Sequence, residues 1–221
     1  MWSRKELKTQ AKANFKGHYW KSIGAFVVYA LFTGTYTAAS QTGEVQEATE
    51  AGDAGAGLIL GVGAALLGIM IFIAVLNVII TNVVQVGYYS FLLNCDGKEP
   101  KIGDLFSYFK KGYGRIAGGM FVTDLIVALW SVLFCIPGAI AHYKYELVPF
   151  LLADNPEMTG KEARQKSAEL MKGNKWNAFV LDLSFIGWYI LGGCTCGILN
   201  LFWVTPYQNQ TRAQLYLTLK K

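Results

Sequence analysis

The sequence has few charged residues and long stretches without any. Charged residues make up 16% of the 221 positions, against about 25% in soluble domains. No Asp, Glu, Lys, Arg or His occurs from Ala54 to Cys95, nor from Leu183 to Thr211. Each stretch exceeds the roughly 20 apolar residues that a helix needs to cross a bilayer. The scarcity of charge excludes a soluble single domain and a disordered chain, and it favours a multi-spanning membrane protein.

Residues suited to metal and nucleophilic chemistry are also scarce. The chain has two histidines, His18 and His142, and four cysteines without the spacing of a zinc site. It has no phosphate-binding loop, no nucleophile-elbow motif and no metalloprotease helix motif. We therefore expect no catalytic residue, no metal ligand and no cofactor, and we predict that the protein is not an enzyme.

The positive charge that is present lies between the apolar segments. Of the 20 Lys and Arg residues, six lie in residues 1–21, five in residues 98–115 and five in residues 161–175. The segment 41–57 is acidic and has no basic residue. Lys and Arg collect in cytoplasmic connections of membrane proteins. The pattern predicts a multi-pass protein of the bacterial cell membrane with both termini in the cytoplasm, facing anionic lipid headgroups and not nucleic acid.

The apolar segments predict an all-α membrane bundle of about six transmembrane helices, arranged as three hairpins within a single domain. An amphipathic interfacial helix precedes each hairpin, and the first and third begin with capping boxes, Ser3 with Glu6 and Thr159 with Glu162. An i, i+4 pair from Glu162 to Lys166 supports the third. The predicted spans are 21–40, 58–94, a hairpin over 116–153 that turns at Pro137-Gly138, and a hairpin over 176–219 that turns near 192–197.

Two parts of this topology have alternatives. Residues 207–212 are too polar to face lipid, so they lie in the bundle interior or form an amphipathic helix at the membrane surface. A five-span arrangement would place the C-terminus, with Arg212, outside the cell. The basic start of the chain reads as an interfacial helix, although residues 36–40 resemble a signal-peptide cleavage site.

The hairpins suggest an internal repeat with units 1–95, 96–155 and 156–221. Each hairpin begins after a local pattern of Lys, Gly and an aromatic residue, as in Lys16-Gly17-His18-Tyr19-Trp20. Such a pattern anchors a turn from the membrane surface into the bilayer. The alternative is that any segment entering a membrane collects these residue types.

Four charged residues lie inside the predicted spans: Asp124, Lys144, Glu146 and Asp182. A charge near the bilayer centre costs about 2.5–3.5 kcal/mol, so each should face protein or water. Helix rise places Asp124, Lys144 and Asp182 at similar depths, and we predict an inner-leaflet polar cluster. His142 is four residues from Glu146 and could pair with it. The cluster forms a pocket for a ligand or a proton, or else structural ion pairs that fix helix packing.

Small residues line one face of the second predicted span. Gly57, Gly61 and Ala65 recur at four-residue spacing, which lets helix backbones approach closely. This face packs within the chain, or it contacts a second copy or another membrane protein.

Several local motifs recur together along the chain. They are Glu6-Leu7-Lys8, Gly17-His18-Tyr19-Trp20, Ile136-Pro137-Gly138, Leu151-Leu152-Ala153-Asp154-Asn155-Pro156 and Leu170-Met171-Lys172-Gly173-Asn174-Lys175. Together they resemble the domain-of-unknown-function 975 family of integral membrane proteins from Firmicutes. The resemblance implies a location in the bacterial cytoplasmic membrane, and it implies no established activity, catalytic residue or cofactor. His142 and the acidic segment 41–57 depart from the family pattern.

Two functions follow from the sequence as hypotheses. The first is a transport or lipid-handling component that works through the inner-leaflet polar pocket. The second is a non-transporting accessory, regulatory or immunity-type protein that binds another membrane protein through the small-residue face.

Overall fold

The described part of the chain is helical, and a computed structural model shows how its helices are placed. No strand occurs among the residues that the structure describes. The all-α prediction is confirmed for this part of the chain. The described residues are 3–41, 68–69, 77–109, 112–133, 135–195 and 197–220.

A short helix stands near the start of each predicted unit, namely α1, η1 and α7. Whether the units arose by duplication stays a prediction. The elements are α1 (Arg4–Gly17), α2 (Tyr19–Gln41), a helix over residues 77–94, the 3₁₀ helix η1 (Ile102–Phe109), α4 (Tyr113–Leu133), α5 (Cys135–Tyr145), α6 (Val148–Asp154), α7 (Gly160–Leu170), α8 (Lys175–Leu183), α9 (Ile186–Cys194), the π-helical η2 (Asn200–Val204) and α10 (Thr205–Lys220).

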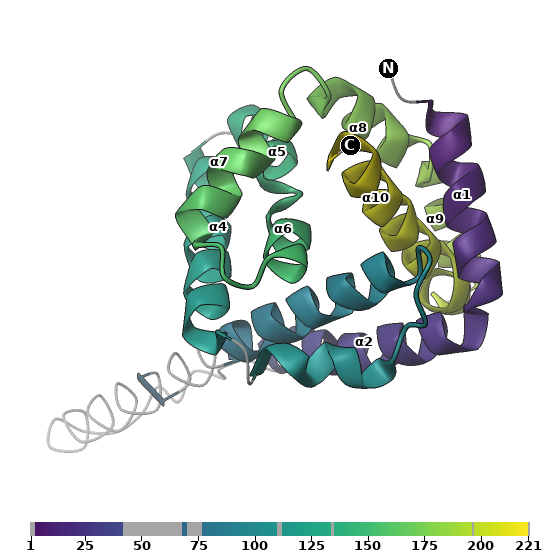
Figure 1. Ribbon diagram of the computed structural model, residues 1–221, viewed down its shortest axis with the longest axis horizontal. Helices are drawn as coiled ribbons and strands as arrows, with labels where there is room; N and C mark the ends of the chain where they lie inside the picture. The colour runs from purple at the N-terminus through teal and green to yellow at the C-terminus, as the bar shows by residue number, and fades with distance from the viewer. Residues whose placement is uncertain are drawn as a thin grey trace, which may run out of the picture.

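The helices are arranged in two groups joined by a third (Figure 1). One group consists of α1, α8, α9 and α10, with α1 packed along α10. The opposite group consists of α4, α5, α6 and α7, in which α7 contacts α4, α5 and α6. Along a third side, α2 and the helix over 77–94 run between the two groups.

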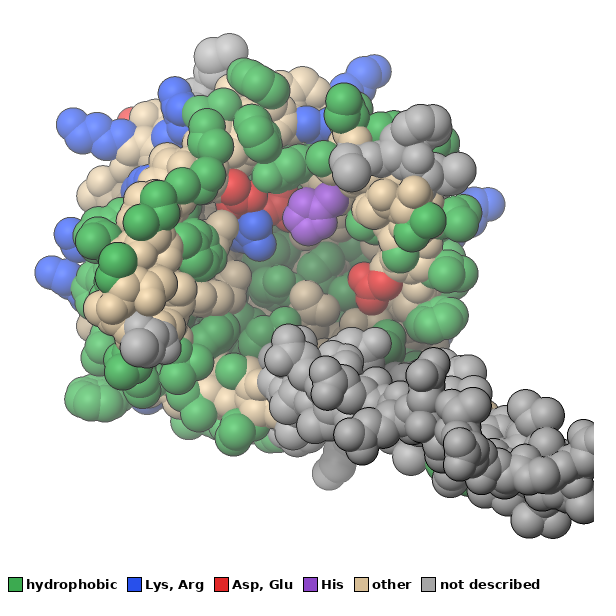
Figure 2. Space-filling view, turned by 180° about the vertical axis from the view of Figure 1, so that it is seen from behind, with side chains coloured by type: hydrophobic (Ala, Val, Ile, Leu, Met, Phe, Trp, Pro, Cys, Tyr) green, Lys and Arg blue, Asp and Glu red, His purple; other side chains and the backbone are tan. Residues whose placement is uncertain are grey.

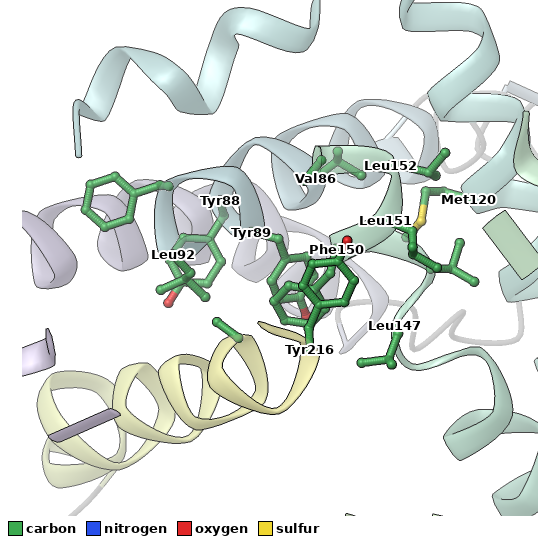
Figure 3. Close-up of a cluster of buried hydrophobic side chains, with 14 of the residues drawn as sticks. Val86, Tyr88, Tyr89, Leu92, Met120, Leu147, Phe150, Leu151, Leu152 and Tyr216 are labelled. Carbon is green, nitrogen blue, oxygen red and sulfur yellow. The ribbon is translucent and has the colours of Figure 1, made fainter. Parts of the chain in front are cut away.

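An aromatic core joins these groups (Figure 3). The ring of Tyr89, in the helix over 77–94, lies 4.3 Å from that of Phe150 in α6. Phe150 in turn stacks on Tyr216 of α10 at 5.7 Å between centroids. All three rings are buried, and each fully buried large apolar side chain contributes about 1.5–3 kcal/mol. The core therefore fixes α6 and α10 against the helix between them.

The amphipathic helices differ in how they begin. In α1 the predicted apolar face is confirmed, because Leu7, Ala11 and Phe15 are buried. This face is covered by α10. The predicted capping box of α1 is wrong, since the Ser3 side chain caps no amide of the first turn. The helix opens instead on the backbone bond from the amide of Leu7 to the carbonyl of Ser3.

The capping box of α7 is confirmed. The amide of Glu162 donates to the Thr159 hydroxyl at 3.3 Å, and the amide of Thr159 donates to the Glu162 carboxylate at 2.9 Å. The predicted pair between Glu162 and Lys166 is wrong, because the cap holds that carboxylate at the start of the helix. Lys166 lies 4.0 Å from Glu169 instead.

One of the two predicted turns is displaced. The hairpin does not turn at Pro137-Gly138, because α4 ends at Leu133 and α5 already begins at Cys135. Proline is tolerated in the first turn of a helix, where its missing N–H is not needed. A Cβ on Gly138 would lie 2.6 Å from Cα of Ser131, so this glycine lets α5 approach α4.

The turn near residues 192–197 is confirmed. It begins where α9 ends at Cys194 and includes Gly197, whose φ of +81° suits glycine. The amide of Gly197 donates to the carbonyl of Gly192 at 2.9 Å.

Two segments of the described chain are long and apolar enough to cross a membrane, Tyr113–Val132 and Lys175–Cys194. Only 28% of the first and 22% of the second is buried within the chain, so most of each apolar segment lies on the outside of the described structure. Between them, α5 has 11 residues and reaches about 16 Å, roughly half the bilayer core. The six-span arrangement stays a prediction.

The polar segment before the C-terminus lies in the interior, which decides between the two alternatives left by the sequence. Gln208, Asn209, Gln210 and Thr211 are all buried within α10. Their polar atoms need partners there, and Gln210, for example, donates to the carbonyl of Leu92 at 3.4 Å.

Candidate functional site

A buried guanidinium joins two of the predicted intramembrane acids. Arg212 projects from α10, Asp182 from α8, and Glu146 follows the last turn of α5. Nη2 of Arg212 lies 2.9 Å from Oδ2 of Asp182, and Nε lies 3.0 Å from Oε1 of Glu146. Their side chains are 22%, 18% and 6% exposed, in the order Arg212, Asp182, Glu146. Three helices from two of the predicted units therefore meet at one cation.

Neutral side chains hold the Asp182 carboxylate in place. Nε2 of Gln208 donates to Oδ1 at 2.9 Å, and the Tyr143 hydroxyl donates to Oδ2 at 3.2 Å. The Tyr189 hydroxyl donates to the Gln208 amide oxygen, which fixes the amide. Because these donors complete its hydrogen bonding, Asp182 is a fixed structural anchor for Arg212.

Beside this network the molecule has a cavity of about 290 Å³. Figure 2 shows this hollowed face, with acidic, basic and histidine side chains gathered in it. We call it the acidic cavity. It is lined by the charged or titratable side chains of Asp124, His142, Glu146 and Arg212 and by the uncharged residues Gln85, Tyr89, Met120, Thr123, Val127, Ala128, Tyr145, Pro149 and Phe150.

Glu146 lines this cavity and has an unused acceptor. Its Oε2 is buried and accepts no hydrogen bond from any residue that the structure describes. Nε of Arg212 lies 3.0 Å from Oε1 of Glu146 but makes no hydrogen bond within the described residues. This contact is therefore an ion pair that is poorly aligned for hydrogen bonding. A buried carboxylate oxygen without a donor is costly. Glu146 is therefore suited to receive a donor from a molecule in the cavity.

Asp124 lines another wall of the same cavity. It lies on α4, and its Oδ2 accepts a hydrogen bond from Nδ2 of Asn82 at 2.8 Å. Among the described residues, the cavity and the network behind it contain three acids, Asp124, Glu146 and Asp182, and one guanidinium, that of Arg212. With the carboxylates ionised, this arrangement attracts cationic groups.

The structure brings together three of the four predicted cluster residues and separates the fourth. Asp124 and Glu146 share the acidic cavity, and Asp182 lies behind it on Arg212. Lys144 does not join them: its Nζ lies 5.0 Å from the centre of the Tyr145 ring, and it lines a different surface groove. Lys144 and Glu146 are two residues apart, so a helical backbone directs them to different sides.

Two other predictions have different outcomes. His142 lines the acidic cavity as a neighbour of Glu146, but the charge that Glu146 contacts is Arg212. The small-residue face of Gly57, Gly61 and Ala65 lies outside the described residues.

Sequence reasoning missed Arg212 as the central cation. A signal was present, since three acids in apolar segments require a positive partner and Arg212 lies in a segment too polar for lipid. No group of three or more His, Cys, Asp or Glu residues within the described ranges is placed to hold a metal ion.

Fold and site together define an all-helical protein with two exposed apolar helices and a buried Arg–carboxylate network beside an acidic cavity. Residues 64–221, well over half of the chain, match a family described as "protein of unknown function (DUF975)". The chain belongs to this family, as its motifs indicate. Comparisons with curated proteins and with solved structures found no match.

Proposed function

We propose that this protein is a multi-pass protein of the bacterial cytoplasmic membrane, with six spans and with both termini in the cytoplasm. The apolar outer faces of the two long segments support this placement. On α4, Leu129 and Val132 are 62% and 87% exposed, and on α9 Ile190 is 64% exposed. Contiguous exposed apolar surface of this kind is rare on soluble monomers. The basic connectors between spans favour the cytoplasmic side.

Within this placement, the acidic cavity is a binding site for a hydrogen-bond-donating cationic group, and the protein works in transport or lipid handling. The observation that carries this proposal is Glu146, which lines the cavity and whose buried Oε2 accepts no hydrogen bond from a described residue. Tyr89, Tyr145 and Phe150 line the same cavity, and aromatic faces attract cations.

The mechanism is competition between the ligand and Arg212. A cation that pairs with Glu146 weakens the hold of Arg212 on that carboxylate, while Asp182 keeps its other donors. The link from α10 to the end of α5 then loosens, but the link from α10 to α8 remains. Binding is thereby coupled to movement of the second hairpin against the third.

Cysteine labelling tests the placement. Lys101→Cys and Lys166→Cys, each in a background without the four native cysteines, should be protected from an impermeant thiol reagent on intact cells and labelled after permeabilisation. A cysteine at Glu47, which lies outside the described residues, should be labelled on intact cells. Labelling of Lys101→Cys on intact cells would overturn the topology.

Charge-selective labelling tests the cavity. Ala128→Cys lines it, and cationic and anionic methanethiosulfonate reagents of similar size report its field. Each reaction rate with the introduced cysteine is divided by the rate of the same reagent with a free thiol. The normalised rate of the cationic reagent should then be at least about ten times that of the anionic reagent. Adding Glu146→Gln and Asp124→Asn should bring the ratio towards one. A ratio unaffected by both substitutions would refute a cation site and favour the accessory role.

A further inference from the structure

Two further cavities lie on the surface formed by α5 and α7. One, of about 230 Å³, lies against α4 and α5 and includes Trp130, Ile140 and Lys144. The other, of about 200 Å³, lies against α7 and includes Lys144, Lys161 and Arg164. Both are lined by Lys144 and Tyr145, so they are neighbouring parts of one groove. We call it the α5–α7 groove.

The two ends of this groove differ in chemistry. At the α4 end, Trp130 is 48% exposed and Ile140 is 52% exposed, which leaves an apolar wall open. At the α7 end three cations line the groove, and no carboxylate from the described part of the chain lines either cavity. The groove is therefore amphipathic along its length, with an uncompensated positive end.

The cations are held in a way that suits a ligand. Nη1 of Arg164 donates to the carbonyl of Gly119 at 3.2 Å and to the Thr123 hydroxyl at 3.4 Å, so the guanidinium is fixed on α4. Nζ of Lys144 is positioned over the Tyr145 ring. No ion pair with a described residue neutralises Lys144, Lys161 or Arg164. A fixed guanidinium beside two free ammonium groups is a typical receptor for phosphate.

We propose that the α5–α7 groove binds an anionic phospholipid. The phosphate contacts Lys144, Lys161 and Arg164, and an acyl chain lies along Ile140 and Trp130. This inference rests on the membrane placement proposed above but not on the acidic cavity. Tryptophan is favoured at the level of lipid headgroups, and basic residues near that level attract anionic lipids. The proposal gives Lys144, which the polar cluster excludes, a role of its own.

Lipid titration of the purified full-length protein in detergent tests the proposal, with bound lipids counted by native mass spectrometry. Phosphatidylglycerol should bind more tightly than phosphatidylcholine of the same acyl chains. Lys144→Gln with Lys161→Gln should weaken phosphatidylglycerol binding about 30-fold. Each basic group near the membrane surface contributes about 1 kcal/mol, and the loss of about 2 kcal/mol corresponds to this fold-change. The matched control, Lys166→Gln with Lys172→Gln, removes two exposed lysines outside the groove and should change binding less than twofold.

Other outcomes would overturn the proposal. Equal affinity for the two lipids, or an equal effect of the control pair, would show that no specific site exists. Displacement of phosphatidylglycerol by millimolar glycerol phosphate, with no advantage of long over short acyl chains, would indicate a soluble phosphate ligand. Glu146→Gln should leave lipid binding unchanged, so failure here is distinguishable from failure of the acidic cavity. Unchanged helical circular dichroism and a monodisperse elution profile confirm that each variant is folded.

Discussion

Removing the Arg212 guanidinium should destabilise the protein more than any surface charge change. Arg212→Met leaves Glu146 and Asp182 without their shared cation, and both carboxylates are more than four-fifths buried. Breaking a buried ion pair on one side costs about 3–5 kcal/mol, because the remaining charge stays buried and unpaired. For a chain of this size, such a loss lowers the melting temperature by roughly 6–20 °C.

The assay is thermal unfolding of detergent-purified protein, followed by tryptophan fluorescence. The control is Arg115→Met, which breaks the exposed pair between Arg115 and Glu157 and should cost no more than about 1 kcal/mol. A triple variant, Arg212→Met with Glu146→Gln and Asp182→Asn, removes every charge of the network. It should recover at least half of the lost stability, because neutral replacement of a whole buried pair is often nearly neutral.

Either of two results would contradict this account of the network. A melting temperature of Arg212→Met within about 2 °C of the wild type would show that water screens the network fully, against its burial. A triple variant as unstable as the single one would show that packing around the arginine stem, and not unpaired charge, sets the cost.

Three further predictions concern α7. Gly160→Ala should destabilise the protein, since its Cβ would lie 2.3 Å from Cα of Gly119 on α4. Gly118 faces open space, so Gly118→Ala should be neutral or stabilising by up to about 1 kcal/mol. Chemical unfolding of both variants measures the difference. Thr159→Ala should cost about 1 kcal/mol by removing the cap and Thr159→Ser much less, also measured by chemical unfolding. Hydrogen bonds from Thr159 lower the pKa of Glu162. The Glu162 carboxylate should therefore stabilise the fold at pH values above the pKa that Glu162 has in the unfolded chain. This stabilisation should be lost as the pH falls through the lowered pKa of the folded state. Glu162→Gln should flatten this part of the profile of stability against pH.

The sequence identified the acids of the site but not their geometry. Glu146 and Asp182 could be found because a charge in an apolar segment must face protein or water. Lys144 was placed with them by depth alone, and depth carries no information about the side of the helix. The side is set by helix period, which separates Lys144 from Glu146. Arg212 could not be assigned until the interior position of α10 was known.

Turn positions show the same limit. The turn after α9 could be predicted because several glycines lie together there, and Gly197 adopts a positive φ that suits this residue. Pro137-Gly138 carries an equally strong turn signal, yet both residues lie inside α5. A Pro-Gly dipeptide can mark a turn, or it can place a proline in the first turn of a helix and a glycine at a close helix contact. Only the tertiary contact with Ser131 distinguishes the second case from the first.

The polar composition of α10 follows from its place among the three units. Its Gln214 donates to the Asp96 carboxylate at 3.3 Å, where the second predicted unit begins. Its Tyr216 donates to the Asp154 carboxylate at 2.9 Å, where the second unit ends. Its Arg212 joins the second unit to the third. A helix that contacts polar groups of several neighbouring segments needs donors on several sides, so an apolar α10 would lose these hydrogen bonds and the ion pairs of Arg212. The same donors that make this segment unsuited to lipid therefore hold the units together around the acidic cavity.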